Sequence, residues 1–480
     1  MPPSGGSKTG DSFVVHDLLK MTREWPPPLS DAHPHGPIPV GRLGRVLDRL
    51  LDAYARAEAG TPADRAVREV FRSAPDLGSS ERTAVRDRLF GLFRMRRRID
   101  DVLERAATAE RRNLSTIDVP MRQRMQVLAY LALTGTPASE IARLDPRAAK
   151  RIPRLFERIT NGRVPAKKHA PLEALAIEVG LPTWMVRRLV ESLSQTRAEP
   201  ILRSLQGRAP ISLRVRKGID REEIRTRLAT ERNVAVELTP WSPYGLLLER
   251  AVDLTGFAPL EAGHIELQDE GSQLIALACG VQPGHIVLDA CAGAGGKTLA
   301  LAAELGIQGN LTAMDPEARK LRELVRRAER DPTMAPIRVQ TRSLETLPDD
   351  FRGAFDVVLV DVPCSGTGTL RRAPDLAWRL RESDVGRHAT DQLRLLTTAS
   401  TTVAPQGRLI YATCSVFEEE NEAVSRAFLE SEPRFHPHAL VHSWGRALSS
   451  QFGATYEARI GPGPTRKGPD GFYVAQFQRI

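Results

Sequence analysis

Aromatic side chains are scarce in this sequence: Phe, Trp and Tyr together make up 5% of its 480 residues. So few rings argue against a surface that binds single strands by stacking many bases. Cysteine is also rare, and no two of the four copies form a Cys-x-x-Cys pair. A chain of this length would not depend on so few disulfides, so we expect reduced thiols in a cytoplasmic protein, any of which is a candidate nucleophile. The four are Cys279, Cys291, Cys364 and Cys414.

Long apolar runs are absent as well. No stretch of about 18 apolar residues occurs, and the first residues carry no apolar segment typical of a signal peptide. We therefore expect neither a membrane-spanning nor a secreted protein. Lys and Arg number 68 against 59 Asp and Glu, a formal charge of +9. This balance favours nucleic acid or another anionic partner, and the alternative is a basic surface that serves solubility alone.

The chain is long enough for about three domains. Residues 1–40 are rich in Pro and Gly and predict a disordered tail. Residues 41–160 repeat apolar side chains at helical spacing and predict an all-α domain. Residues 161–265 predict linker helices and a small α+β segment with strands at 211–215, 234–238 and 245–248. Residues 266–480 form the last predicted domain.

One predicted helix of the all-α domain begins near Ser79, which we expect to cap it. Arg94, Arg96, Arg97 and Arg98 follow on this helix almost without a break. Arginine donates two parallel hydrogen bonds to phosphate, so these side chains are candidates for RNA contact. The alternative is a solvated helix face.

From about residue 284 the pattern alternates between strand and helix. Strands are predicted at 285–290, 310–315, 337–341, 355–361, 408–413 and 472–477, and helices at 296–305, 316–330, 384–403 and 421–430. Alternating units with apolar strands predict an α/β fold: a doubly wound, Rossmann-like parallel sheet with helices on both faces. Ligands of such sheets bind beyond the carboxyl ends of the strands.

The first of these strands ends in a glycine-rich turn, Asp289-Ala290-Cys291-Ala292-Gly293-Ala294-Gly295-Gly296-Lys297-Thr298. Such a turn lets a ligand approach the backbone, and the next helix offers its N-terminus. A dinucleotide fingerprint would need Gly at position 298, and a phosphate-binding loop would need Gly at position 291. An NTPase stays a rival, because Gly296-Lys297-Thr298 supplies the end of that loop and Asp361 ends an apolar strand, where an NTPase holds Mg²⁺.

The other strands end in residues that carry chemistry. Asp315 ends the second and is suited to bind two ribose hydroxyls. Asp361-Val362-Pro363-Cys364 and Thr413-Cys414-Ser415 place two cysteines past the ends of two further strands. A thiolate is a strong nucleophile when a nearby cation lowers its pKa, and Lys297 is a candidate cation. Cys279 has no such setting and is interpreted as a small core residue.

These motifs resemble the Sun/nucleolar-protein family of RNA (cytosine-5) methyltransferases over roughly residue 211 to the end. The resemblance rests on residues 268–273, 289–298, 361–375, 411–415, 419–422 and 470–472. Residues 77–82 and 89–94 are similar to the NusB-like domain of the bacterial 16S ribosomal RNA methyltransferases in that family.

The resemblance implies S-adenosylmethionine as methyl donor, RNA as partner, and no metal. It implies that the Cys414 thiolate adds to cytosine C6, that Cys364 assists breakdown of the adduct, and that Asp361 and Lys297 act at the cytosine ring. The residues implied to hold the cofactor are Cys291, Ala292, Gly293, Ala294, Gly295, Gly296, Lys297, Asp315 and Asp361.

The chain departs from the family pattern in places. Gly293-Ala294 stands where the family usually has Ala-Pro, Ala373 where it has Asn, and Thr341-Arg342-Ser343 where it has an acidic residue near the adenine.

Four functions stay open. Ribosomal RNA is the expected substrate because of the NusB-like half, and transfer RNA is the nearest alternative. An RNA-binding assembly factor without activity is disfavoured by the presence of both cysteines and Lys297. A DNA cytosine-5 methyltransferase would attack with Cys364, and the Thr413-Cys414 motif disfavours it.

Overall fold

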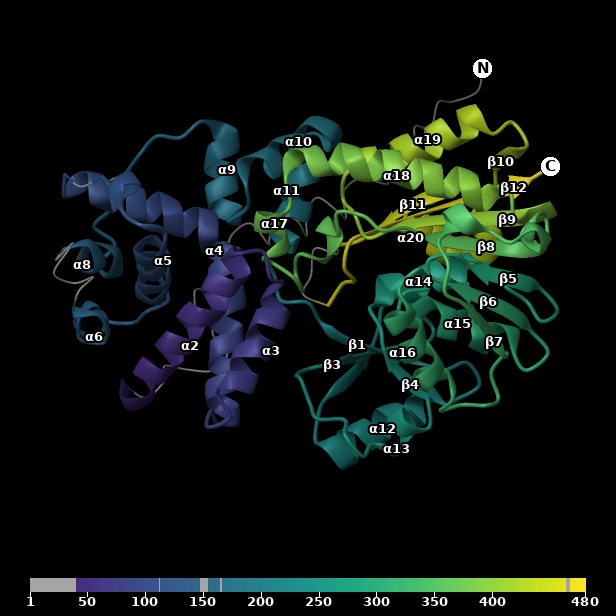
Figure 1. Ribbon diagram of the computed structural model, residues 1–480, viewed down its shortest axis with the longest axis horizontal. Helices are drawn as coiled ribbons and strands as arrows, with labels where there is room; N and C mark the ends of the chain where they lie inside the picture. The colour runs from purple at the N-terminus through teal and green to yellow at the C-terminus, as the bar shows by residue number, and fades with distance from the viewer. Residues whose placement is uncertain (1–39, 112, 147–153, 165, 463–466) are drawn as a thin grey trace, which may run out of the picture. The chain divides into compact units, whose positions relative to one another are not determined.

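The computed structural model describes residues 40–480, except 112, 147–153, 165 and 463–466 (Figure 1). The chain divides into two compact units, Met1–Thr183 and Trp184–Ile480, each with its own dense set of contacts. This division falls after residue 183, whereas the sequence predicted domain boundaries after residues 160 and 265. The predicted tail lies outside the described residues, apart from Val40, which begins the first helix described.

The first unit is helical, as predicted. Its elements are α2 (Val40–Glu58), α3 (Ala63–Ser73), α4 (Ser79–Ala109), the short 3-10 turn η2 (Leu114–Thr116), α5 (Val119–Leu133), α6 (Ala138–Leu144), α8 (Leu155–Thr160) and α9 (Pro171–Val179). The backbone N–H of Gly78 donates to Glu81 Oε2 at 3.0 Å, so α4 is capped one residue before Ser79. Tyr54 of α2 is fully buried and its hydroxyl donates to Gln126 Oε1 of α5 at 2.9 Å.

Two of the α4 arginines predicted to contact RNA, Arg96 and Arg97, form ion pairs within this unit. Arg96 forms an ion pair with Glu58, and Arg97 Nη2 lies 3.0 Å from Glu173 Oε1 on α9. These contacts anchor α2 and α9 to α4. RNA contact by the arginines at 94 and 96–98 remains a prediction.

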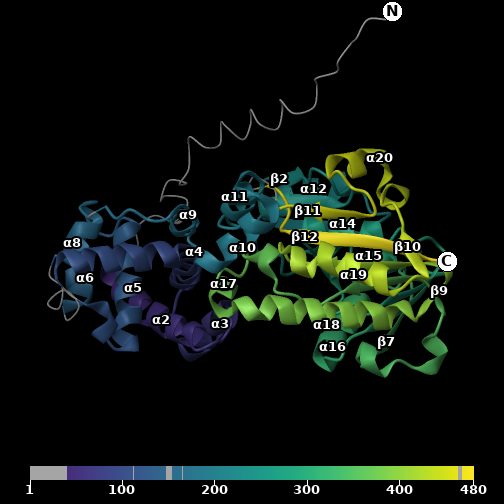
Figure 2. The same cartoon turned by 90° about the horizontal axis from the view of Figure 1, so that it is seen from above.

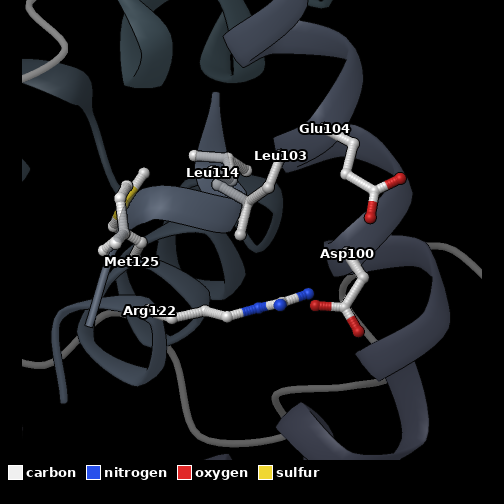
Figure 3. Close-up of a pocket in the computed structure, with 7 residues that line it drawn as sticks. Asp100, Leu103, Glu104, Leu114, Arg122 and Met125 are labelled. Atoms are coloured by element: carbon white, nitrogen blue, oxygen red, sulfur yellow. The ribbon is translucent and has the colours of Figure 1, made fainter. Parts of the chain in front are cut away.

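A small cavity lies where α4 and α5 diverge (Figure 3). Arg122 of α5 points across it toward Asp100 of α4, and Leu103, Leu114 and Met125 supply apolar walls. Glu104 and Arg122 in its lining are exposed, so the cavity lies at the surface of the helical unit.

The second unit begins with α10 (Thr183–Leu193) from Trp184 onward, followed by α11 (Gln195–Ser204). A four-stranded antiparallel sheet then forms in the order β2-β3-β1-β4. Its elements are β1 (Ile211–Val215), α12 (Arg221–Arg232), β2 (Val236–Leu238), β3 (Gly245–Leu248), α13 (Ala258–Glu261) and β4 (Ile265–Leu267). This confirms the small α+β segment and adds one strand, β4, that the sequence pattern did not predict.

The large sheet has eight strands in the order β10-β12-β9-β8-β5-β6-β7, with β11 on β12. The five strands β5 (Ile286–Asp289), β6 (Asn310–Met314), β7 (Ile337–Gln340), β8 (Phe355–Asp361) and β9 (Val403–Thr413) are parallel. The three strands β10 (Phe435–Pro437), β11 (Glu457–Ile460) and β12 (Phe472–Arg479) pair antiparallel. The predicted parallel core is confirmed, and the antiparallel edge is a further feature.

Helices cover both faces of this sheet (Figures 1 and 2). On one face lie α14 (Glu270–Ala278), α15 (Gly296–Leu305), α16 (Ala318–Ala328) and α20 (Val441–Gln451). On the other lie α18 (Glu382–Ser400) and α19 (Glu422–Ser431). The short helix α17 (Leu376–Arg379) precedes α18. Cys279 is fully buried just after α14, which confirms its interpretation as a core residue. Among the described helices, none is both long and apolar enough to cross a membrane.

Two glycines give a matched test of packing in the helical unit. A Cβ on Gly91 of α4 would lie 2.1 Å from the hydroxyl of fully buried Tyr130, whereas a Cβ on Gly44 of α2 would meet nothing within 4 Å. We expect Gly44→Ala to stabilise the protein by up to about 1 kcal/mol through helix propensity. Gly91→Ala should destabilise it by about 1–3 kcal/mol, because overpacking outweighs that gain. Urea unfolding of both variants measures the signs, and equal signs would contradict the packing argument.

Candidate active site

The loops that carry the predicted site residues meet at one end of the large sheet. The chain runs outward from β5 through β6 to β7, and then returns to β8 on the other side of β5. At such a reversal the connections leave in opposite directions and open a crevice outside the carboxyl ends of the strands. Because these strands are parallel, the loops that follow β5, β6, β8 and β9 all begin on this side of the sheet.

Two glycines shape the turn between β5 and α15. Gly293 and Gly295 have φ of +56° and +88°, a region that favours glycine. A Cβ on Gly295 would lie 2.2 Å from Leu324 Cδ1, whereas one on Gly293 would meet nothing within 4 Å. Gly295 therefore packs the turn against α16, and Gly293 leaves open space beside the backbone.

Asp315 holds the glycine turn in place. It is buried at the end of β6, where Oδ2 accepts from the backbone N–H of Gly293 at 3.0 Å and Oδ1 from that of Glu317 at 2.8 Å. Each carboxylate oxygen keeps a second lone pair for a ligand hydroxyl. Asp315 thus supports the glycine turn and also offers hydrogen-bond acceptors at the edge of that turn.

The segment after β7 contains no carboxylate between Thr341 and Ser343. Thr341 and Arg342 are exposed, and the backbone oxygen of Ser343 accepts from the backbone N–H of Thr346 at 3.1 Å. The departure from the family pattern therefore lies in a solvent-facing turn.

Asp289, at the end of β5, is a buried carboxylate beneath the turn. It is 1% exposed, and its Oδ2 accepts from Thr298 Oγ1 at 2.7 Å. Burial raises the pKa of Asp289 to about 6, and the hydrogen bond from Thr298 opposes this shift. The side chain fastens the first turn of α15 to the end of β5. The neighbouring Cys291 is half-buried and packs against the hydrophobic core.

Lys297 and Asp361 form an ion pair across the crevice. Lys297 Nζ lies 2.6 Å from Asp361 Oδ2 and 5.7 Å from the ring centre of Phe472. Burial lowers the pKa of Lys297, but the charges of Asp361 and Cys414 more than offset this, so its pKa is raised and the ammonium persists. A fixed cation therefore stands beside the end of β9.

The two predicted cysteines lie together. Cys364 Sγ and Cys414 Sγ are 3.3 Å apart, close enough for a hydrogen bond in which either thiol donates. Both side chains are half-buried and neither forms a disulfide. The structure thus brings Cys364, Cys414, Asp361 and Lys297 into one cluster beside the glycine turn.

Sequence reasoning gave no role to Glu420, which the structure places directly behind the two cysteines. Its carboxylate accepts hydrogen bonds from both Ser365 and Ser415, the residues that follow Cys364 and Cys414. The available signal was a short acidic run, residues 418–420, just after a cysteine motif.

Three further segments quoted for the resemblance converge on one ion-pair cluster. Arg372 lies 2.8 Å from Asp269 and also pairs with Asp470. Burial raises the pKa of Asp470 to about 6, with the nearby charge of Asp269 acting in the same sense. The cluster fixes the loop before β12, whose Gly471 approaches Gly368 so closely that a Cβ on Gly368 would lie 2.0 Å from the Gly471 carbonyl oxygen.

Known proteins share this architecture. A family described as 16S rRNA methyltransferase RsmB/F matches residues 276–478, and one described as the RsmF/B-like ferredoxin-like domain matches residues 181–255. The ribosomal RNA small subunit methyltransferase B of Xanthomonas campestris is 30% identical over 353 residues, 73% of this chain and 76% of that protein. The chain belongs to the RsmB/F methyltransferase family. The resemblance stated from the motifs is confirmed.

Solved structures agree on the fold. The structure of PH0851 matches with a TM-score of 0.73 at 24% identity, covering 92% of this chain and 99% of that chain. NSun6 from Pyrococcus horikoshii, solved with SFG, matches with a TM-score of 0.51 at 18% identity, covering 61% of this chain and 98% of that chain. These likenesses support the Rossmann-like methyltransferase fold.

The pKa of Asp289 generates a prediction for stability. A folded-state pKa near 6, above the unfolded value of about 3.9, means that stability present below pH 4 is lost as pH rises through 6. Asp289→Asn removes this loss and keeps one acceptor and one donor for Thr298. Relative to the unchanged protein, the variant should gain about 3 kcal/mol between pH 4 and 7.5. Urea unfolding at both pH values tests this, and a difference that does not change with pH would contradict it.

Proposed function

We propose that this methyltransferase transfers a methyl group from S-adenosylmethionine to C5 of a cytosine in RNA, through a covalent bond between Cys414 and C6. The observation that carries the proposal is the pair of thiols 3.3 Å apart beside a half-buried lysine–aspartate ion pair. Cytosine C5 is a poor nucleophile, and addition of a thiolate at C6 converts it into an enamine carbon.

The crevice suits S-adenosylmethionine. The open space at Gly293 admits a ligand against the backbone, and Asp315 offers acceptors at the rim for ribose hydroxyls. The other residues proposed to hold it are Cys291, Ala292, Ala294, Gly295, Gly296, Lys297 and Asp361. When bound, it supplies a methyl group on a positively charged sulfur. The SFG of the NSun6 structure, an analogue of S-adenosylmethionine, supports the same choice.

The residues of this chain have distinct tasks in the proposed reaction. The Cys414 sulfur forms the bond to C6 beside the Lys297 ammonium. Asp361 accepts a hydrogen bond from the cytosine ring edge, and its pairing with Lys297 fixes its orientation. After C5 is methylated it loses its proton to water, the bond from C6 to Cys414 breaks, and Cys364 assists that release. Positioned acid and base groups of this kind contribute about 10²–10⁴-fold to a rate.

We infer that the substrate is 16S ribosomal RNA, as the family description and the name of the Xanthomonas relative support. The helical unit and the net charge of +9 fit an RNA partner. Transfer RNA is the second candidate. An assembly factor without activity and a DNA enzyme that attacks with Cys364 remain the rivals that experiment must exclude.

The two cysteines should give opposite signatures. Cys414→Ala cannot form the bond to C6, so it should be inactive and trap no RNA. Cys364→Ala can attack but should stall at release, and should accumulate a protein–RNA adduct that survives a denaturing gel. The double variant should show no adduct. The assay is a denaturing gel of each variant after incubation with substrate RNA and S-adenosylmethionine.

Adduct from Cys414→Ala but none from Cys364→Ala would reverse the assignment. Intact methylation without any adduct would remove covalent cysteine catalysis. Cys279→Ala is the matched control, since Cys279 is fully buried in the core and has no part in the proposed reaction.

The substrate prediction is tested in cells. RNA from a deletion strain should lose one protected cytosine of 16S ribosomal RNA in bisulfite sequencing, and the unchanged gene should restore it. Complementation with the Cys414→Ala variant should not restore it. Loss confined to transfer RNA would replace the substrate, and no loss in any RNA would contradict the proposed activity.

A further inference from the structure

Glu420 is a charged side chain that bridges the two cysteine loops. It is 0% exposed and lies in the short 3-10 turn η6 (Glu418–Glu420) after β9. Oε2 accepts from the hydroxyls of Ser365 and Ser415, each at 2.5 Å. Oε1 accepts from the Ser365 backbone N–H at 2.8 Å and from Gln392 Nε2 at 3.0 Å. Four donors of this kind compensate the cost of burying a carboxylate.

These bonds attach to both cysteine motifs at once. Ser365 follows Cys364, and Ser415 follows Cys414. The Gln392 amide also donates to the carbonyl of Pro363 at 3.1 Å, so the loop is held on both sides of Cys364. Glu420 therefore helps to set the 3.3 Å distance between the two sulfur atoms, together with the direct hydrogen bond from the Ser365 hydroxyl to that of Ser415 at 3.2 Å.

The charged groups around the two thiols are of opposite sign. The hydrogen bond with Cys414 raises the pKa of Cys364 well above its usual value, and burial and the charge of Glu420 raise it further. Tyr411 also faces Cys364, and burial holds the pKa of that phenol well above its usual value. Cys414 instead interacts with Lys297, whose own partner is Asp361. Glu420 thus acts on Cys364, and Lys297 interacts with Cys414.

We propose that Glu420 is a positioning residue that sets the distance between the two cysteines and keeps the proton of the pair on Cys364. The proposal rests on the proposed function, in which Cys414 is the nucleophile. With the proton on Cys364, Cys414 is the member of the pair that attacks C6, beside the Lys297 ammonium. When the bond from C6 to Cys414 breaks, its electron pair returns to the Cys414 sulfur, and the Cys364 thiol donates a hydrogen bond to that sulfur.

Glu420→Gln separates charge from geometry. An amide oxygen can keep the bonds from the Ser365 N–H and Gln392, and an amide nitrogen can donate to the Ser365 and Ser415 hydroxyls, which accept after rotating. The variant therefore keeps the bridge and loses the charge. Glu420→Ala loses both. Glu430→Gln is the matched control, because Glu430 is exposed on α19.

The first measurement needs no RNA. In the full chain carrying Cys414→Ser, the rate of alkylation of Cys364 by iodoacetamide is followed against pH by mass spectrometry of its peptide. Burial and the charge of Glu420 remain in this variant, so we expect a midpoint above the usual cysteine value of about 8.5. Adding Glu420→Gln should lower the midpoint by about one pH unit, since a nearby anion disfavours the thiolate. Adding Glu430→Gln should leave it unchanged.

Coinciding midpoints with and without Glu420→Gln would overturn the proposal. If Glu420→Gln fails to fold, a midpoint at or below the usual value in the Cys414→Ser protein overturns it alone. If the midpoint shifts but the unchanged protein methylates no cytosine, the proposed function fails. The effect of Glu420 on the proton of Cys364 is then still supported.

The second measurement tests the consequence for the reaction. With RNA and S-adenosylmethionine, Glu420→Gln should slow adduct formation, and turnover with it, by about 10-fold, with a KM for RNA within about 2-fold, because the proton of the pair is held less firmly on Cys364. Glu420→Ala should lose both adduct and turnover. Equal rates of adduct formation by Glu420→Gln and the unchanged protein would contradict the proposal.

Discussion

The parallel register between β8 and β9 is the constraint on which the site depends. Asp361 pairs with Ala412, so the residues just past both strands emerge at the same level of the sheet. Cys364 and Cys414, which are 50 residues apart in the chain, are adjacent for that reason. A slip of one residue would turn the end of β9 over and separate the two thiols. The buried apolar faces of both strands make such a slip costly.

Nearby charged groups then make the surroundings of Cys364 and Cys414 differ, although the two side chains are the same. The Lys297 cation is placed by the first turn of α15, which Thr298 fastens to Asp289. The Glu420 anion is placed by the turn after β9. The glycine turn and the acidic run thus each place a charged group near the cysteine pair, although they lie more than a hundred residues apart in the sequence.

The sequence predicted the strand-end residues of this site because each follows an apolar strand whose pattern is local. It predicted the parallel core because strands and helices alternate from residue 286 onward. It did not predict the role of Glu420, whose hydrogen-bond partner Ser365 is 55 residues away. Nor did it predict β10 and β11, which are short and owe their strand conformation to pairing with β12. Interactions that depend on distant partners leave little local pattern.

The antiparallel strand β12 contributes to the site through the loop that precedes it. It pairs with β9 along the register from Tyr473 with Thr413 to Gln478 with Arg408, which brings the loop before it to the crevice. Phe472 thereby covers one side of the Lys297 ammonium, and Gly471 meets Gly368 with no room for a side chain on either. Asp470, held by Arg372, fixes the loop from behind. Because β12 runs antiparallel to β9, the loop before it forms one wall of the site. The parallel strands of the same sheet carry the reactive groups.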